Sequence, residues 1–163
     1  MSEKELRALI DLSSKAIGDL FYKDGHIIPM WHAIDDKGRE HLLPSTLQDK
    51  DTTVAFVRAL FEIMHVKRYV FIDEAWMLST QMPQEAEVKE IHKRGIANHP
   101  ERIEIVLFSG EDSEWGQLMA HRRIERPPGK RAYLGPLQFP DGGKLMRAEG
   151  RMVGLLPAQG AKQ

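Results

Sequence analysis

The segment from residue 66 to residue 78 is apolar on both of its faces, and this constrains the fold more than any other feature of the sequence. Successive side chains of an extended strand point to opposite faces of a sheet. Here both alternating sets of positions are largely apolar, with Val70, Ile72, Trp76 and Leu78 in one set and Tyr69, Phe71, Ala75 and Met77 in the other. Such a strand needs protein on either side. We therefore expect residues 66–78 to form a central strand.

Two amphipathic helices are expected before this strand. Residues 3–22 carry apolar side chains at helical spacing, behind a capping box made by Ser2 and Glu5. A second helix is expected to begin behind Asp51 as its N-cap, because apolar side chains then recur at helical spacing from residue 54 to residue 64. Each helix therefore has one apolar stripe with which to cover a sheet.

The other expected strands are short. Residues 27–35 and 39–43 are extended segments joined by Asp35-Asp36-Lys37-Gly38, whose Asp and Gly content is typical of a tight hairpin turn. Pro29 cannot donate a ladder hydrogen bond, so we expect it at the start of a strand or on an outer edge. Further strands are expected at residues 103–109, 117–124, 132–139 and 144–155.

These elements predict an α+β fold. We expect two principal helices packed on a mostly antiparallel sheet of about five or six strands, in the order α-β-β-α-β-β-β. Residues 1–156 are expected to form a single domain, since 163 residues is an ordinary length for one. Residues 79–100 are expected to be a mobile excursion, within which a helix can be drawn at residues 85–94. Residues 157–163 are expected to be a frayed tail.

Composition excludes several classes of protein. The chain is 42% hydrophobic and 29% charged, as in soluble globular proteins, and its longest apolar runs are too short to span a membrane. It contains no cysteine, which excludes disulfides, zinc–thiolate sites and cysteine nucleophiles. The start, Met1-Ser2-Glu3-Lys4-Glu5, is acidic where a secretory signal is basic, so we expect a cytoplasmic protein without a membrane partner.

Charge is distributed unevenly along the chain. Residues 1–116 carry 14 basic and 21 acidic side chains, a formal charge of −7, whereas residues 117–163 carry 9 and 3, a formal charge of +6. The densest basic run lies at residues 121–131, with five Lys or Arg against one Glu. There, Arg126, Lys130 and Arg131 are candidates for binding an anion or nucleic acid from an exposed turn. Pairing of this run with the acidic part of the chain is the alternative.

Two adjacent carboxylates, Asp73 and Glu74, interrupt the central apolar strand. They are expected on opposite faces, and one of them inside the fold. A structural ion pair of Glu74 with Arg122 or Arg123 is one interpretation. The alternative is a metal-dependent hydrolase or nuclease, in which Asp73 or Glu74 joins His99 and Glu101 to hold a divalent metal that activates water.

The seven histidines do not indicate a local metal site, because no two of them have the spacing of helical ligands. Phosphate-loop, dinucleotide-binding and serine-hydrolase motifs are also absent from the sequence. We therefore expect a non-catalytic binding or assembly module that acts through self-association or a protein partner, without a cofactor. Its candidate apolar anchors are Met30, Trp31, Trp76 and Met77.

Two short motifs resemble a known group of proteins. Glu74-Ala75-Trp76 on the central strand is followed by His99-Pro100-Glu101-Arg102, a pattern similar to that of small uncharacterised bacterial and phage-encoded proteins. The resemblance covers about residues 66–110. It implies a bacterial, possibly phage-related protein and brings no assigned activity, so it assigns no site residue.

Overall fold

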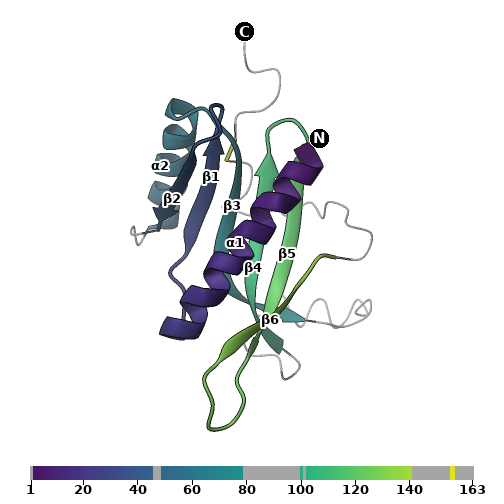
Figure 1. Ribbon diagram of the computed structural model, residues 1–163. Helices are drawn as coiled ribbons and strands as arrows, with labels where there is room; N and C mark the ends of the chain where they lie inside the picture. The colour runs from purple at the N-terminus through teal and green to yellow at the C-terminus, as the bar shows by residue number, and fades with distance from the viewer. Residues whose placement is uncertain (1, 46–48, 79–99, 101, 141–154, 157–163) are drawn as a thin grey trace, which may run out of the picture.

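The structure is a computed structural model, which describes residues 2–45, 49–78, 100, 102–140 and 155–156. In chain order the elements are helix α1 (Ser2–Asp24), strands β1 (Met30–Asp35) and β2 (Glu40–Pro44), helix α2 (Lys50–Ile63), and strands β3 (Val66–Leu78), β4 (Arg102–Asp112), β5 (Gly116–Glu125) and β6 (Tyr133–Gln138). The strands form one antiparallel sheet in the order β2-β1-β3-β4-β5-β6 (Figure 1). The α+β prediction is confirmed. Four strands follow α2, one more than the predicted order contains.

The two helices cover opposite faces of this sheet. Helix α1 crosses one face diagonally (Figure 1), where Val70 and Ile72 of β3 belong to its core cluster. Helix α2 packs against the other face, where Tyr69 and Phe71 belong to a second cluster with Phe61 of the helix. Strand β3 lies between β1 and β4 and is buried from both sides. The expectation of a central strand at residues 66–78 is therefore confirmed.

Helix α1 is held to the sheet by a regular apolar stripe. Leu6, Ile10, Ile17 and Phe21 are at most 2% exposed and recur at the spacing of one helix face. Burying each such side chain stabilises the fold by about 1.5–3 kcal/mol. The helix lies so close to β4 that a Cβ atom on Gly110 would be 2.9 Å from Leu6. The position of α1 over the sheet is therefore fixed by side-chain packing on both partners.

The β1–β2 hairpin is organised by one buried carboxylate. The Asp35 side chain is fully buried and accepts hydrogen bonds from the backbone N–H groups of Lys37 and Arg39, from the Arg39 guanidinium and from His41. These donors, with His41 the largest contribution, hold the pKa of Asp35 far below its usual range. Gly38 supplies the positive φ of 77° that the turn needs. The predicted hairpin is confirmed.

Helix α2 begins two residues before its predicted start. Its N-cap is Asp49, whose carboxylate accepts a 2.9 Å hydrogen bond from the Thr52 backbone N–H and a hydrogen bond from the Thr52 hydroxyl. Asp51, the predicted cap, lies in the first turn, where its charge favours the helix N-terminus. The cap is Asp49 because its carboxylate accepts the hydrogen bond from the backbone N–H of the residue three positions on.

The remaining predictions agree in part with the structure. Strands β4, β5 and β6 contain or closely match the segments expected at residues 103–109, 117–124 and 132–139. Residue 29 directly precedes β1, as expected for its proline. The expected helix at residues 85–94 and the tail at 157–163 lie outside the described residues, as do the excursion at 79–100 except for its last residue and the strand at 144–155 except for its last residue. No helix in the described part of the chain is long and apolar enough to cross a membrane.

Candidate functional site

One end of the sheet extends past helix α1. After α1 the chain returns along the sheet, and the Ile27 backbone N–H donates a 3.1 Å hydrogen bond to the Glu74 carboxylate on β3. The next side chain of β3 on that face is Trp76, whose direct partner on β4 is Glu104. The middle of β3 is buried, but Trp76 near its end is 40% exposed. This end of the sheet therefore presents an accessible aromatic ring.

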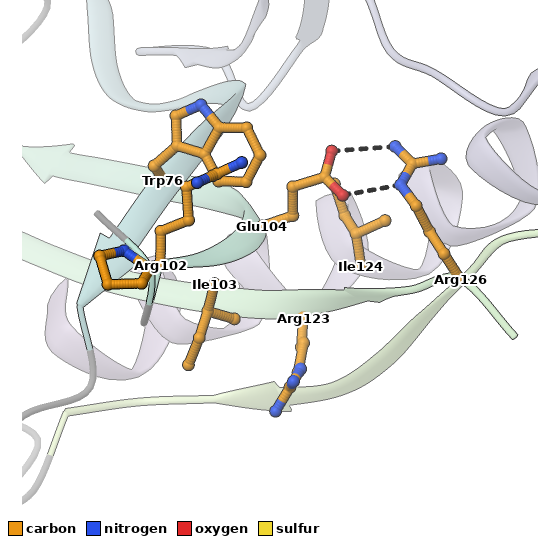
Figure 2. Close-up of a pocket in the computed structure, with 8 residues that line it drawn as sticks. Trp76, Arg102, Ile103, Glu104, Arg123, Ile124 and Arg126 are labelled. Carbon is orange, nitrogen blue, oxygen red and sulfur yellow. Dashed lines mark hydrogen bonds and ion pairs between the residues drawn. The ribbon is translucent and has the colours of Figure 1, made fainter. Parts of the chain in front are cut away.

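A cavity of about 400 Å³ opens beside this ring. Figure 2 shows the side chains that line it, which come from β3, from the start of β4 and from the end of β5: Trp76, Pro100, Arg102, Ile103, Glu104, Arg123, Ile124 and Arg126. Among the residues that the structure describes, the lining contains three guanidinium groups and one carboxylate. Its formal charge is therefore positive.

Arg102 stacks on Trp76. The guanidinium carbon of Arg102 lies 4.8 Å from the centre of the Trp76 ring, and Figure 2 shows the guanidinium against that ring. The contact is a cation–π interaction, which at exposed sites contributes about 0.5–1 kcal/mol. It holds a planar cation and a planar aromatic ring together at the mouth of the cavity.

Glu104 and Arg126 form a two-bonded ion pair in the same cavity. Nε and Nη2 of Arg126 donate hydrogen bonds of 2.7 and 3.0 Å to the two oxygens of Glu104 (Figure 2). The bond from Arg126 lowers the pKa of Glu104, and the same bond raises the pKa of Arg126. Both groups therefore stay charged near neutral pH. Arg126, expected to be an exposed cation, is half exposed but paired.

Ile103 and Arg123 point away from the Glu104 side of the strands (Figure 2). The guanidinium of Arg123 lies 3.7 Å from the carboxylate of Glu125, and its side chain is 56% exposed. Such exposed pairs are weak in water. Arg123 therefore adds positive charge at the edge of the cavity rather than a buried ion pair.

A second cavity, of about 520 Å³, lies between α1 and β6. It is lined by Lys15, Gly18, Asp19, Tyr22, Arg122, Tyr133 and Leu134. Tyr22 and Tyr133 are 55% and 46% exposed. The guanidinium carbon of Arg131 lies 5.6 Å from the centre of the Tyr22 ring, so a second cation–aromatic contact is found here. Both cavities thus combine exposed aromatic rings with cations.

The two cavities are lined from neighbouring strands. Ile124 lines the first cavity and Leu134 the second, and these residues are direct partners on β5 and β6. The exposed cations Lys130 and Arg131 lie in the connection between the two strands, as expected from the sequence. We call the whole region the strand-end surface, defined by Tyr22, Trp76, Arg102, Glu104, Arg123, Arg126, Lys130, Arg131 and Tyr133.

Arg122 differs from the predicted ion pair. Arg122 and Arg123 alternate along β5, and Arg122 is the one on the α1 face. Its guanidinium donates to three backbone carbonyls, those of Gly135 at 2.6 Å, Ser14 at 2.8 Å and Leu134 at 3.1 Å. Partial burial lowers the pKa of Arg122, and the charge of nearby Asp19 opposes this effect. Arg122 therefore ties α1 to β6, and Glu74 takes the Ile27 N–H as its partner instead.

Of the four predicted metal-site residues, Asp73 and Glu74 lie in the described part of the chain. Asp73 and Glu74 alternate along β3, so Asp73 lies on the α2 face and Glu74 on the α1 face. Partial burial raises the pKa of Asp73. His99 and Glu101 lie outside the described residues. Among the residues that the structure describes, no group of three His, Asp or Glu side chains is placed to hold a metal ion.

One serine–histidine contact has the residue types of a hydrolase's catalytic pair, but it is buried and inaccessible to a substrate. Ser13 Oγ on α1 lies 2.8 Å from Nδ1 of His32 on β1, and Nε2 of His32 lies 3.4 Å from a carboxylate oxygen of Glu40. Ser13 is 1% exposed and faces the sheet from within the helix. A buried hydroxyl is not accessible to a substrate carbonyl, so the contact fastens α1 to strand β1 of the sheet.

The basic run at residues 121–131 divides between the faces of β5. His121 is on the α2 face with Arg123, and burial lowers its pKa, so it contributes less charge than its neighbours. Of the candidate anchors, Met30 and Trp31 are buried in the core, whereas Trp76 is exposed. Sequence reasoning missed the Tyr22–Arg131 contact, because Tyr22 is read there as part of a helix and nothing local places that helix beside β6.

A scan against protein-family models and searches of curated proteins and of solved structures return no match to this chain. The resemblance to bacterial and phage-encoded proteins therefore stays a prediction.

Proposed function

We propose that the chain is a non-catalytic binding module and that the strand-end surface takes an anionic partner. The observation that carries this proposal is the cavity beside Trp76, where a guanidinium is stacked on an exposed ring and the one carboxylate is already paired. The described lining holds three guanidinium groups against that one carboxylate, so its formal charge is positive. An anion is the ligand that such a site attracts.

The charge along the connection between β5 and β6 supports the same partner. Lys130 and Arg131 are exposed beside a turn in which the Lys130 N–H donates to the Pro127 carbonyl. The strand-end surface carries five Lys or Arg side chains against one Glu, or two when Glu125 is included. A surface of one sign steers an oppositely charged partner and raises its association rate.

Self-association and docking of a protein partner are the other forms of the proposed binding role. Excess positive charge on the strand-end surface disfavours a second copy of the same surface, since like charges would meet across a two-fold axis. Sedimentation velocity at several protein concentrations, in low and in high salt, distinguishes a monomer from a self-associating protein. The proposal predicts a sedimentation coefficient that does not change with protein concentration. As part of the same proposal the protein acts in the cytoplasm. A chain without cysteine does not depend on disulfides, which the reducing cytoplasm disfavours.

Calorimetric titration with long-chain inorganic polyphosphate tests the proposal. Wild-type protein is expected to bind with an affinity that falls as salt rises. The double substitution Arg102→Gln and Arg126→Gln is expected to weaken binding about tenfold or more. The matched control removes two cations at the opposite end of β3 and its neighbouring turn, Lys37→Gln with Lys67→Gln, and is expected to bind like wild type. Equal losses in both variants, or no binding by wild type, would contradict the proposal.

A further inference from the structure

Building on the proposed function, we propose that the partner is a single-stranded nucleic acid, which lies across both cavities with bases against Trp76 and Tyr22. The two cavities lie over neighbouring strands, because Ile124 of the first and Leu134 of the second are direct partners on β5 and β6. A path over both leads from β3 across the sheet to the end of α1, with the Lys130–Arg131 connection beside it.

Two exposed aromatic rings on this path point to a ligand that contains planar groups. Trp76 and Tyr22 each have a guanidinium over the ring, at 4.8 and 5.6 Å. Aromatic rings and arginine planes are the surfaces on which unpaired bases stack. A polyanion without bases gains nothing from these rings. Their exposure, 40% for Trp76 and 55% for Tyr22, leaves room for such contact.

The position of Glu104 favours a base over a phosphate in the first cavity. Its carboxylate lies between Trp76 and Arg126 in the lining (Figure 2) and repels a phosphate there. The same carboxylate can accept a hydrogen bond from an N–H group of a base, either an amino group or the ring N3–H of thymine and uracil. Phosphates then belong beside Lys130 and Arg131, which are exposed in the connection between β5 and β6. A strand with alternating bases and phosphates fits this arrangement of charge.

A duplex fits less well than a single strand. In a duplex the base faces are stacked on one another, so they cannot stack on the rings of Trp76 and Tyr22. In the described part of the chain both helices pack on the sheet faces, and neither is presented at the strand-end surface as a reading helix for the major groove. The exposed rings at the cavities therefore select unpaired nucleotides.

Fluorescence anisotropy with labelled twelve-residue oligothymidylate and oligouridylate tests the inference, with a duplex of equal length and long-chain polyphosphate as competitors. Both single strands offer the same kind of base and phosphate groups to this site. Comparing oligothymidylate with oligouridylate shows whether DNA or RNA binds more tightly. Trp76→Leu and, separately, Tyr22→Leu are expected to weaken single-strand binding about tenfold. Neither substitution is expected to change polyphosphate binding. Lys37→Gln with Lys67→Gln is the control in every arm.

The salt dependence separates stacking from charge. Trp76→Leu is expected to leave the slope of log affinity against log salt unchanged, whereas Arg131→Gln is expected to reduce it by about 0.7. If polyphosphate binds and Trp76→Leu and Tyr22→Leu leave single-strand affinity unchanged, the surface binds anions and the nucleic-acid inference is wrong. Equal affinity for duplex and single strand overturns the inference too. If neither polyphosphate nor either single strand binds, the proposed function itself fails. Thermal melts of each variant show whether it folds, and Tyr22 supplies a second test should Trp76→Leu not fold.

Discussion

The Nη1 atom of Arg122 lies 2.6 Å from the position that a Cβ atom on Gly18 would occupy. Gly18 is therefore the gap in α1 through which the guanidinium reaches the Ser14 carbonyl. The same guanidinium holds the Gly135 and Leu134 carbonyls, so one side chain joins the helix to the last strand of the sheet. This junction sets the spacing between Tyr22 on α1 and the residues of β6.

Gly18→Ala is expected to destabilise the protein by about 1–3 kcal/mol. An Ala in place of Gly within a helix ordinarily stabilises it by about 0.5–1 kcal/mol. Here the added methyl displaces a guanidinium from its carbonyls and leaves buried polar groups unpaired. Urea denaturation measures the change. Lys15→Ala, at a side chain 75% exposed on the same helix, is the control and is expected to stay within about 0.5 kcal/mol. A stabilised Gly18→Ala protein would contradict the role given to Arg122.

Asp35→Asn is expected to lower the Tm at neutral pH, with an effect that shrinks on acidification. The folded state holds the pKa of Asp35 below its unfolded value, which is about 4. Its contribution is therefore complete above pH 4 and is lost as the pH falls through the folded value. Thermal melts of both proteins from pH 2 to pH 7 measure the difference. The difference in Tm should narrow steadily as the pH falls below about 4, and a constant offset would be inconsistent with this assignment.

Glu104→Gln separates stability from binding on the strand-end surface. The pair with Arg126 is largely exposed, so its loss is expected to change the free energy of unfolding by only about 0.5 kcal/mol. Removing the carboxylate also leaves the charge of Arg126 unpaired, and polyphosphate affinity is expected to rise about threefold. Calorimetry and urea denaturation measure the two effects. A weaker polyphosphate complex would show that Glu104 assists anion binding rather than opposing it.

Ser13→Ala tests the structural assignment of the Ser13–His32 contact. The substitution is expected to destabilise the protein by about 1 kcal/mol, because His32 loses a buried hydrogen-bond partner. Native wild-type protein is expected to resist a serine-reactive fluorophosphonate, since Ser13 is buried. Rapid labelling of Ser13 in the folded protein, detected by mass spectrometry, would instead point to a catalytic serine.

The central strand and the hairpin could be predicted because their signals are local. The two apolar sets of residues 66–78 and the Asp35–Gly38 turn each depend on neighbours a few positions apart. Arg122 could not be assigned a partner in this way. Its acceptors are backbone carbonyls, which every residue has, so the sequence pattern favoured a carboxylate such as Glu74.

Part of the strand-end surface could be predicted from the sequence. Lys130 and Arg131 stand beside a Pro-Pro-Gly turn, which predicts exposure, and both are exposed. Trp76 looked like a core or interface residue, because nothing in the sequence shows that the sheet extends past α1. The contact of Tyr22 with Arg131 depends on the crossing of α1 over the sheet, which is decided by packing at Gly18 and Gly110.

The indole N–H signals of the three tryptophans test the central proposal most directly. In a ¹H–¹⁵N spectrum titrated with twelve-residue oligouridylate, the Trp76 indole signal is expected to shift progressively with ligand. Trp31, which is 1% exposed, and Trp115, which packs against the α1 core cluster, are expected to stay in place. The Trp76→Leu spectrum assigns the signal. A Trp76 signal that stays fixed while the oligonucleotide binds would show that the strand-end surface is not the binding site.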